Sequence, residues 1–131
     1  MTLVVDTSAI VAMLLDEPSA VVVEQALAEA DERVMSAATV VDLMIVAESR
    51  KGPAGAQKVE EIVRESEIEI VAHDDRCASL AIEGWRRFGK GRHPAALNLG
   101  DCFAYGLARS LGAPLLCVGD DFARTDIDTV L

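Results

Sequence analysis

The stretch TLVVDTSAIVAMLL, residues Thr2–Leu15, opens the chain with a short apolar run, an aspartate and a second apolar run. The first run, Thr2–Val5, is unbroken and rich in β-branched residues, which is typical of a strand buried on both faces of a parallel sheet. The second run, about Thr7–Leu15, has the length and composition of a helix. Asp6 lies between them, where an acidic side chain can cap the helix. A strand that passes directly into a helix favours an α/β fold.

The same alternation of strand and helix continues along the chain. Strands separated by helices are typical of a parallel sheet with both faces covered. We therefore expect a single domain over residues 1–131, with a three-layer α/β/α arrangement around a central, mainly parallel sheet. Further strands are expected at Arg33–Ser36, Ile68–His73 and Pro114–Val118, and helices at Ser19–Ala30, Thr39–Arg50, Ala54–Ser66, from Asp74 or Asp75 to about Phe88, and Gly100–Gly112.

Composition and charge limit the kind of protein that this sequence can encode. No apolar stretch approaches the ~20 residues of a membrane span, and no basic leader precedes the first strand. We therefore expect a soluble, cytoplasmic protein with no membrane partner. The three cysteines, Cys77, Cys102 and Cys117, form no C-x-x-C pair, which favours buried reduced thiols over a zinc or redox site. The net charge of −10 counts against a general nucleic-acid coat, although acids gathered at a nuclease metal site also lower the total.

Acidic side chains follow the predicted strands at the places where parallel sheets bind their ligands, which is outside the carboxyl ends of the strands. Asp6 follows the first strand, Asp42 lies in the first turn after the second, and Asp101 opens a later helix. Asp120 and Asp121 follow the last buried strand. Taken singly, each of these acids has a structural explanation as a helix cap, a first-turn acid or a turn residue.

Taken together, the acids favour a metal site. Two carboxylates about 4 Å apart repel by roughly 4 kcal/mol at an effective dielectric constant near 20, whereas a helix cap contributes only about 1 kcal/mol. If the fold brings three or four of these acids to one edge, capping alone does not stabilise the cluster. A divalent cation does, and carboxylate oxygens favour Mg²⁺ or Mn²⁺. The spacing along the chain does not itself establish that the acids converge.

One basic stretch, WRRFGKGRH at Trp85–His93, contrasts with the acidic composition of the chain. Its cations either complement the end of a helix or grip a phosphate beside the metal site. Signals for other chemistries are absent, since the chain has no Walker-type glycine-rich loop, no G-x-S-x-G motif and only two histidines. A small phosphatase or receiver-like domain is disfavoured because no strand-end Lys or Thr lies in a fitting place.

Several stretches, in a fixed order, make the chain resemble a known family. They resemble the PIN-domain ribonucleases, in particular the VapC toxins of prokaryotic VapBC toxin–antitoxin pairs, over essentially the whole length. The resemblance implies a PIN-like fold and cleavage of RNA by an acidic quartet that holds Mg²⁺ or Mn²⁺. The stretches are VVDTSAIVAML (Val4–Leu14), MSAATVVDLMIVAESR (Met35–Arg50), NLGDCFAYGLA (Asn98–Ala108) and LLCVGDDFARTDI (Leu115–Ile127), with FGKGRHPAALNLGDC (Phe88–Cys102) similar to one VapC subgroup.

The resemblance implies a role for each acid. Asp6 and Asp101 match the first and third family acids and are expected to ligate the metal. Asp42 stands where the family usually has Glu, and its shorter side chain is expected to reach the metal through water. Asp120 matches the fourth acid best, with Asp121 as its competitor, so the fourth assignment stays open at this point.

The resemblance also implies substrate contacts and partners. Ser8 is expected to hydrogen-bond a ligand carboxylate or a water, and Arg92 or His93 to position the RNA backbone. The implied partners are RNA, a cognate VapB-type antitoxin and a second copy of the chain, in a homodimer and a toxin–antitoxin hetero-oligomer. The alternative interpretation is a catalytically weak PIN domain that acts mainly as an antitoxin- or RNA-binding module, with Asp42 as the first sign of decay.

Overall fold

The computed structural model describes residues 1–131 and contains one five-stranded sheet. The strands are β1 (Thr2–Val5), β2 (Glu32–Ser36), β3 (Glu69–Val71), β4 (Leu115–Leu116) and β5 (Thr129–Val130). Their order in the sheet is β3-β2-β1-β4-β5, and every pairing is parallel. The predicted parallel sheet is confirmed, and the strand that opens the chain lies at its centre.

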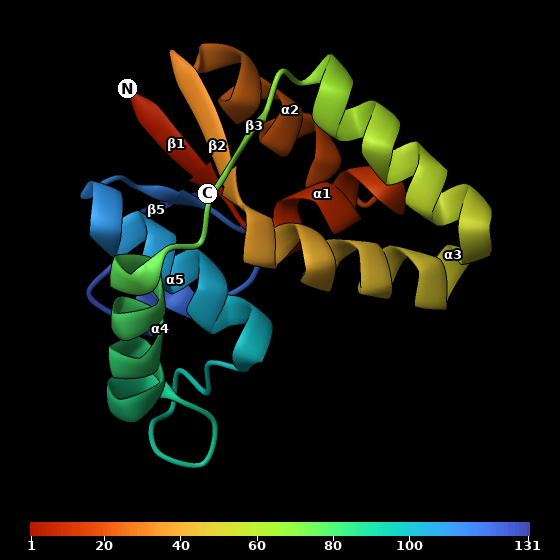
Figure 1. The fold of residues 1–131 in the computed structure, drawn as a ribbon. Coiled ribbons are helices and arrows are strands. Elements are labelled where there is room, and N and C mark those ends of the chain that lie inside the picture. The colour runs from red at the N-terminus through yellow and green to blue at the C-terminus, as the bar shows by residue number, and fades with distance from the viewer.

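Helices cover both faces of this sheet. They are α1 (Thr7–Leu14), α2 (Ala20–Glu29), α3 (Ala37–Glu65), α4 (Asp75–Phe88) and α5 (Leu99–Leu111), with a short 3₁₀ helix, η1, at Phe122–Arg124. Helices α1, α2 and α3 lie on one face, while α4 and α5 pack together on the other (Figure 1). The three-layer α/β/α arrangement is therefore confirmed. None of the helices combines the length and the apolar character that crossing a bilayer requires.

The central strand shows why both outer layers are needed. The side chains of Leu3 and Val5 belong to the core beneath α1, α2 and α3, whereas that of Val4 belongs to the core beneath α4 and α5. All three are fully buried. Because successive side chains of a strand point to opposite faces, an unbroken apolar strand is stable only when both faces are covered.

The long helix α3 differs in part from the prediction. The two expected helices, Thr39–Arg50 and Ala54–Ser66, are the two halves of α3, which meet at a kink. The kink lies at Gly52, whose φ of +70° and ψ of −168° are not helical. Pro53 follows in the first turn of the second half, where a missing backbone N–H costs little. The glycine and proline therefore bend the chain here without separating the two halves.

The start of α3 also differs from the prediction, and the difference bears on Asp42. The helix is capped by Ser36, whose hydroxyl accepts a hydrogen bond from the backbone N–H of Ala38 at 3.1 Å. The hydroxyl of Thr39 is buried and has no hydrogen-bond partner. Thr39 and Asp42 have the spacing of a capping box, with Asp in place of the usual Glu, but this pair is not formed. Asp42 lies in the second turn of the helix and not in the first.

The carboxyl-terminal part of the chain contains shorter strands than expected. The predicted strand at Pro114–Val118 is reduced to the two residues of β4, and the equally short β5 was not predicted. A two-residue strand carries too little alternation to be recognised in a sequence. The predicted end of α5 is confirmed, since Gly112 adopts a left-handed conformation there with a φ of +61°.

Gly84 allows α4 to lie directly against α5. A Cβ at this position would lie 2.4 Å from the Cδ1 atom of Tyr105, which is fully buried. We expect Gly84→Ala to lower the free energy of unfolding by about 1–3 kcal/mol, the usual cost of overpacking, in urea denaturation. Ser79→Ala, on the exposed side of the same helix, should change it by less than about 0.5 kcal/mol. A Gly84→Ala variant as stable as the original chain would contradict this account of the packing.

Candidate active site

Asp6 is an acid buried at the end of the central strand β1. Its exposed fraction is 3%, and it caps α1 with Oδ2. That oxygen accepts hydrogen bonds from the backbone N–H of Ser8 at 3.1 Å and from the Ser8 hydroxyl at 2.6 Å. The other oxygen, Oδ1, is buried and has no hydrogen-bond partner. Because buried polar atoms are nearly always satisfied, the unpartnered oxygen indicates that Asp6 does more than cap a helix.

The hydroxyl of Ser8 connects Asp6 to the neighbouring strand. It donates to Asp6 while accepting a hydrogen bond from the backbone N–H of Val118, just beyond β4, at 2.9 Å. Its proton is therefore used to orient the carboxylate of a candidate metal ligand, one of the roles expected for this residue. A contact between Ser8 and substrate stays a prediction.

Asp42 approaches the same region from α3 and is half-buried. Its Oδ2 accepts a hydrogen bond from the Thr7 hydroxyl at 2.7 Å. On another side it meets Gly100 in the first turn of α5, where a Cβ would lie 2.4 Å from the same oxygen. Thr7 and Gly100 were not among the predicted site residues. No local signal reveals the contact of Thr7 with Asp42, because the two residues are 35 positions apart.

Asp101 lies in the first turn of α5, as predicted, and forms a capping box with Asn98. The backbone N–H of Asn98 donates to Asp101 Oδ2 at 3.0 Å, and the backbone N–H of Asp101 donates to Asn98 Oδ1 at 2.9 Å. Oδ1 of Asp101 takes no part in the box. Asn98 was missed as a site residue, although its spacing of three from an acid at a helix start is a recognisable capping signal.

The charges of these acids affect one another, which indicates that the acids lie near one another. Burial raises the pKa of Asp6 to about 6, and the nearby charge of Asp42 adds to the rise. Burial also raises the pKa of Asp101 to about 7, with further contributions from Asp6, Asp121 and Asp42. The structure thus brings together three acids from different elements that are far apart in the sequence: Asp6 follows β1, Asp42 lies on α3 and Asp101 lies on α5. A positive charge between them would favour their ionised forms.

Of the two candidates for the fourth acid, Asp121 is the one linked electrostatically to the others. Its charge contributes to raising the pKa of Asp101 and that of the buried Cys117, after the larger effect of burial on each. Asp120, the first choice from the sequence, is not among the charges that do so. Both side chains are exposed. The role of either residue as the fourth acid stays a prediction.

The donor set fits a hard divalent cation in its chemistry. It consists of carboxylate oxygens, which Mg²⁺ and Mn²⁺ favour, and one of them, Asp6 Oδ1, is buried without a partner. No lysine or arginine forms a salt bridge with any of these acids. As they lie, no three acidic, histidine or cysteine side chains form a ready ligand group. Asp6 and Asp101 would hold an ion whose other ligands include water, as is usual for Mg²⁺.

The structure does not bring Arg92 or His93 into contact with the acids. The guanidinium of Arg92 stacks on Trp85, 4.1 Å from the ring centroid. The ring of His93 lies edge-on to Phe88 at 5.1 Å, and its Nδ1 accepts a hydrogen bond from the backbone N–H of Ala95 at 3.0 Å. These contacts hold both side chains against α4 and the loop that follows it. Their contact with RNA stays a prediction.

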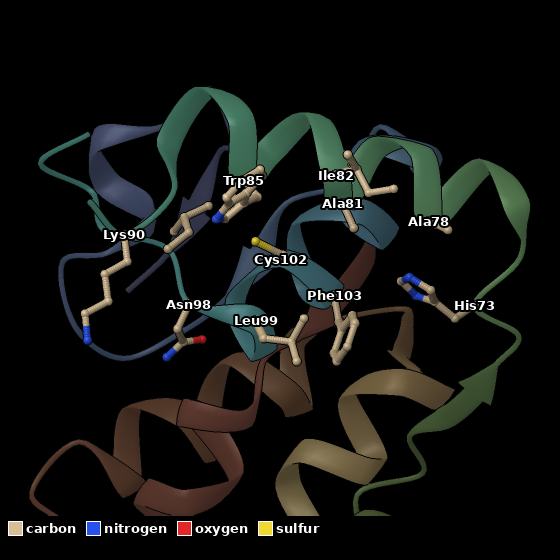
Figure 2. A pocket seen from close by; sticks show the side chains of 11 residues that line it. His73, Ala78, Ala81, Ile82, Trp85, Lys90, Asn98, Leu99, Cys102 and Phe103 are labelled. Carbon is tan, nitrogen blue, oxygen red and sulfur yellow. The ribbon is translucent and has the colours of Figure 1, made fainter. Parts of the chain in front are cut away.

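An apolar groove of about 600 Å³ lies between α4 and α5. Figure 2 shows side chains of both helices facing it, with His73 at one end and Lys90 at the other. Asn98, which caps α5 beside Asp101, also lines it, so the groove adjoins the acidic site. Exposed apolar side chains gathered in this way indicate an interaction surface. Three of the apolar side chains in the groove are exposed, with exposed fractions of 49% for Ile82, 42% for Trp85 and 72% for Leu99.

The raised pKa values predict how stability depends on pH. A carboxyl whose pKa is raised on folding stabilises the fold below its unfolded pKa, and this contribution is lost as the pH rises through the folded pKa. The pH window in which this contribution is lost begins at the ordinary pKa of 3.8 for both residues. It ends at a pKa of about 6 for Asp6 and about 7 for Asp101. We expect Asp101→Asn, which keeps an oxygen for the capping box, to be more stable than the original chain near pH 8.

This advantage of Asp101→Asn should largely disappear near pH 4.5, where the folded chain keeps the proton on Asp101. The measurement is urea denaturation of both proteins in EDTA, which removes divalent cations from the comparison. A difference in the free energy of unfolding that is the same at both pH values would contradict the raised pKa.

Comparison with known proteins shows which family and which solved structures this chain is similar to. Residues 3–128 match the family model described as PIN domain. The structure is similar to that of VapC20 from Mycobacterium tuberculosis, a sarcin–ricin loop cleaving toxin, with a TM-score of 0.76 and 14% identity over 95% of each chain. It is also similar to a DNA-bound VapBC from Salmonella typhimurium, with a TM-score of 0.76 and 18% identity over 99% of this chain and 97% of that one. At these identities the likeness is one of fold.

Two mycobacterial relatives are similar in sequence. Ribonuclease VapC of Mycolicibacterium smegmatis is 44% identical over 128 residues, which are 98% of this chain and 99% of the relative. Ribonuclease VapC30 of Mycobacterium tuberculosis is 48% identical over 130 residues, 98% of each chain. The family model and both relatives cover nearly all of the strands, helices and acids described above. The chain therefore belongs to the PIN-domain family and, within it, to the VapC group that its sequence resembles.

Proposed function

We propose that this chain is a ribonuclease toxin of the VapC type, which cleaves RNA with a bound Mg²⁺ or Mn²⁺ and is neutralised by a VapB-type antitoxin. The observation that carries the proposal is Oδ1 of Asp6, a buried carboxylate oxygen without a partner that lies among converging acids. The sequence relatives named as ribonucleases support the class of reaction. The VapBC assemblies among the similar structures support the class of partner.

The chain's own residues have distinct tasks in this reaction. A divalent cation bound at the site would lower the pKa of a coordinated water and stabilise negative charge on the scissile phosphate. Asp6 and Asp101 would supply the oxygens that hold it, and Ser8 and Asn98 fix the orientation of those two carboxylates. Asp42 accepts hydrogen bonds from water and thereby orients it. The acid after β4, for which we favour Asp121, also orients water, from the carboxyl-terminal part of the chain.

Substitution of either proposed ligand tests this assignment. We expect Asp6→Ala and Asp101→Asn to reduce Mg²⁺-dependent RNA cleavage to background, because each removes a carboxylate charge from the site. The measurement is cleavage of a structured RNA by the purified chain with Mg²⁺, Mn²⁺ or EDTA, with circular dichroism to confirm that the variants are folded. Cleavage by either folded variant at the original rate would contradict the assignment.

The same assay separates the remaining alternatives. Asp121→Asn should slow cleavage more than Asp120→Asn, since only the first charge acts on Asp101. If the original chain binds Mn²⁺ and a VapB-type antitoxin but cleaves no RNA, the alternative of a binding module with weak catalysis is favoured.

Arg92→Ala and His93→Ala test the expected contact of these side chains with the RNA backbone, and each substitution should raise the KM for RNA.

The groove between α4 and α5 is the surface on which we propose that two copies of the chain pair. It combines a hollow with protruding apolar side chains on one face, and a two-fold interface needs such a self-complementary surface. We expect Ile82→Glu, which places a charge in the groove, to convert a dimer to a monomer of 14.0 kDa in light scattering. Leu111→Glu is the control, because its exposed fraction is the same 49% but it does not line the groove. A monomeric original chain would contradict the proposal.

A further inference from the structure

Asp42 differs from the other converging acids in the way in which it is held. Asp6 and Asp101 each take part in a helix cap, which fixes the direction of the side chain. Asp42 caps nothing, because Ser36 caps α3 and Asp42 lies in the second turn of that helix. Its hydrogen bond comes from a different helix, through the hydroxyl of Thr7.

Electrostatics alone would turn Asp42 away from the site. It is half-buried, so rotation of its side chain would bring the carboxylate into water. Repulsion from two other carboxylates favours that rotation, since like charges at short range are costly in a partly buried setting. Its charge nevertheless acts on both Asp6 and Asp101, and its carboxylate lies against Gly100, the residue next to Asp101. The hydrogen bond from Thr7 opposes the repulsion, and hydrogen bonds to charged groups are among the stronger ones.

Gly100 makes room for this arrangement. A Cβ at this position would lie 2.4 Å from Asp42 Oδ2, 2.7 Å from its carboxyl carbon and 2.9 Å from Oδ1. Gly100 does not have a positive φ, and it lies inside α5, so its backbone is one that alanine adopts readily. The carboxylate of Asp42 is therefore the feature of the structure that requires a residue without a side chain here.

We propose that Thr7 and Gly100 are positioning residues for Asp42. The Thr7 hydroxyl holds the carboxylate toward Asp6 and Asp101, and Gly100 leaves open the space that the carboxylate fills. Both act on the affinity of the site for a divalent cation through Asp42, without touching the cation. The inference rests on the proposed function, because it needs a cation at this site.

The test is the affinity of the full chain for Mn²⁺, measured without RNA by the electron paramagnetic resonance signal of free Mn²⁺. Residues that orient metal ligands typically contribute about 10–100-fold to affinity, so Thr7→Val and Gly100→Ala should each weaken binding by a factor in that range. Thr7→Ser keeps the hydroxyl and should restore most of the affinity. This rescue distinguishes positioning from a general effect of substitution next to Asp6.

Two matched controls come from the same chain. Thr2→Val removes another hydroxyl-to-carboxylate hydrogen bond, from Thr2 to Glu32 at 3.0 Å, at the opposite end of β1. Gly84→Ala introduces a comparable clash of a Cβ, against the ring of Tyr105 and not against a carboxylate. Both should bind Mn²⁺ as tightly as the original chain while folded. If Gly100→Ala does not fold, the series Thr7→Val, Thr7→Ser and Thr2→Val still decides the question.

A double-substitution cycle tests whether Thr7 acts through Asp42. In an Asp42→Asn background, Thr7→Val should cause little further loss of Mn²⁺ affinity, and in the original background it should lower kcat for RNA with little change in KM. Unchanged Mn²⁺ affinity in both Thr7→Val and Gly100→Ala, with affinity lost in Asp6→Ala, would overturn the inference and leave the metal site intact. Unchanged affinity in Asp6→Ala would instead overturn the proposed function.

Discussion

The gathering of negative charge at the carboxyl edge of a parallel sheet is the constraint on which the rest of this structure depends. The acids come from separate elements, and burial makes their charged forms costly, as the raised pKa values of Asp6 and Asp101 show. No basic side chain forms a salt bridge with them. The fold tolerates them because a fully covered sheet holds the strand ends in place, and because short hydrogen bonds fix the carboxylates.

Asp6 and Asp101 each use one carboxylate oxygen in a helix cap and leave the other oxygen outside the cap. Asp6 caps α1 with one oxygen and leaves the other buried and unpartnered, while Asp101 gives one oxygen to the capping box of α5. Each of these caps stabilises the start of its helix. Helix capping and metal binding are therefore compatible roles for the same side chain, and the structural explanation of an acid does not exclude the functional one.

The sequence was sufficient for the features that depend on local pattern. An unbroken apolar run placed β1 between two layers of helices, and the order of strands and helices predicted a parallel sheet. It was insufficient where a partner lies far along the chain, as for Thr7 and Asp42, or where two caps compete, as for Ser36 and Thr39. The capping box of Asn98 and Asp101 does have a local signal, which is their spacing of three residues at a helix start. The short strand β5 depends on pairing with β4, and no local pattern reveals such a pairing.

The stacking of Arg92 on Trp85 has a consequence for how this protein can be observed. Trp85 is the single tryptophan of the chain, and it lines the groove that adjoins the acidic site. The guanidinium stacks on its indole, and 42% of the residue is exposed to solvent, so its fluorescence is sensitive to whatever enters that groove. The chain therefore carries a built-in optical reporter on the face where we place the second copy, and the reporter requires no label.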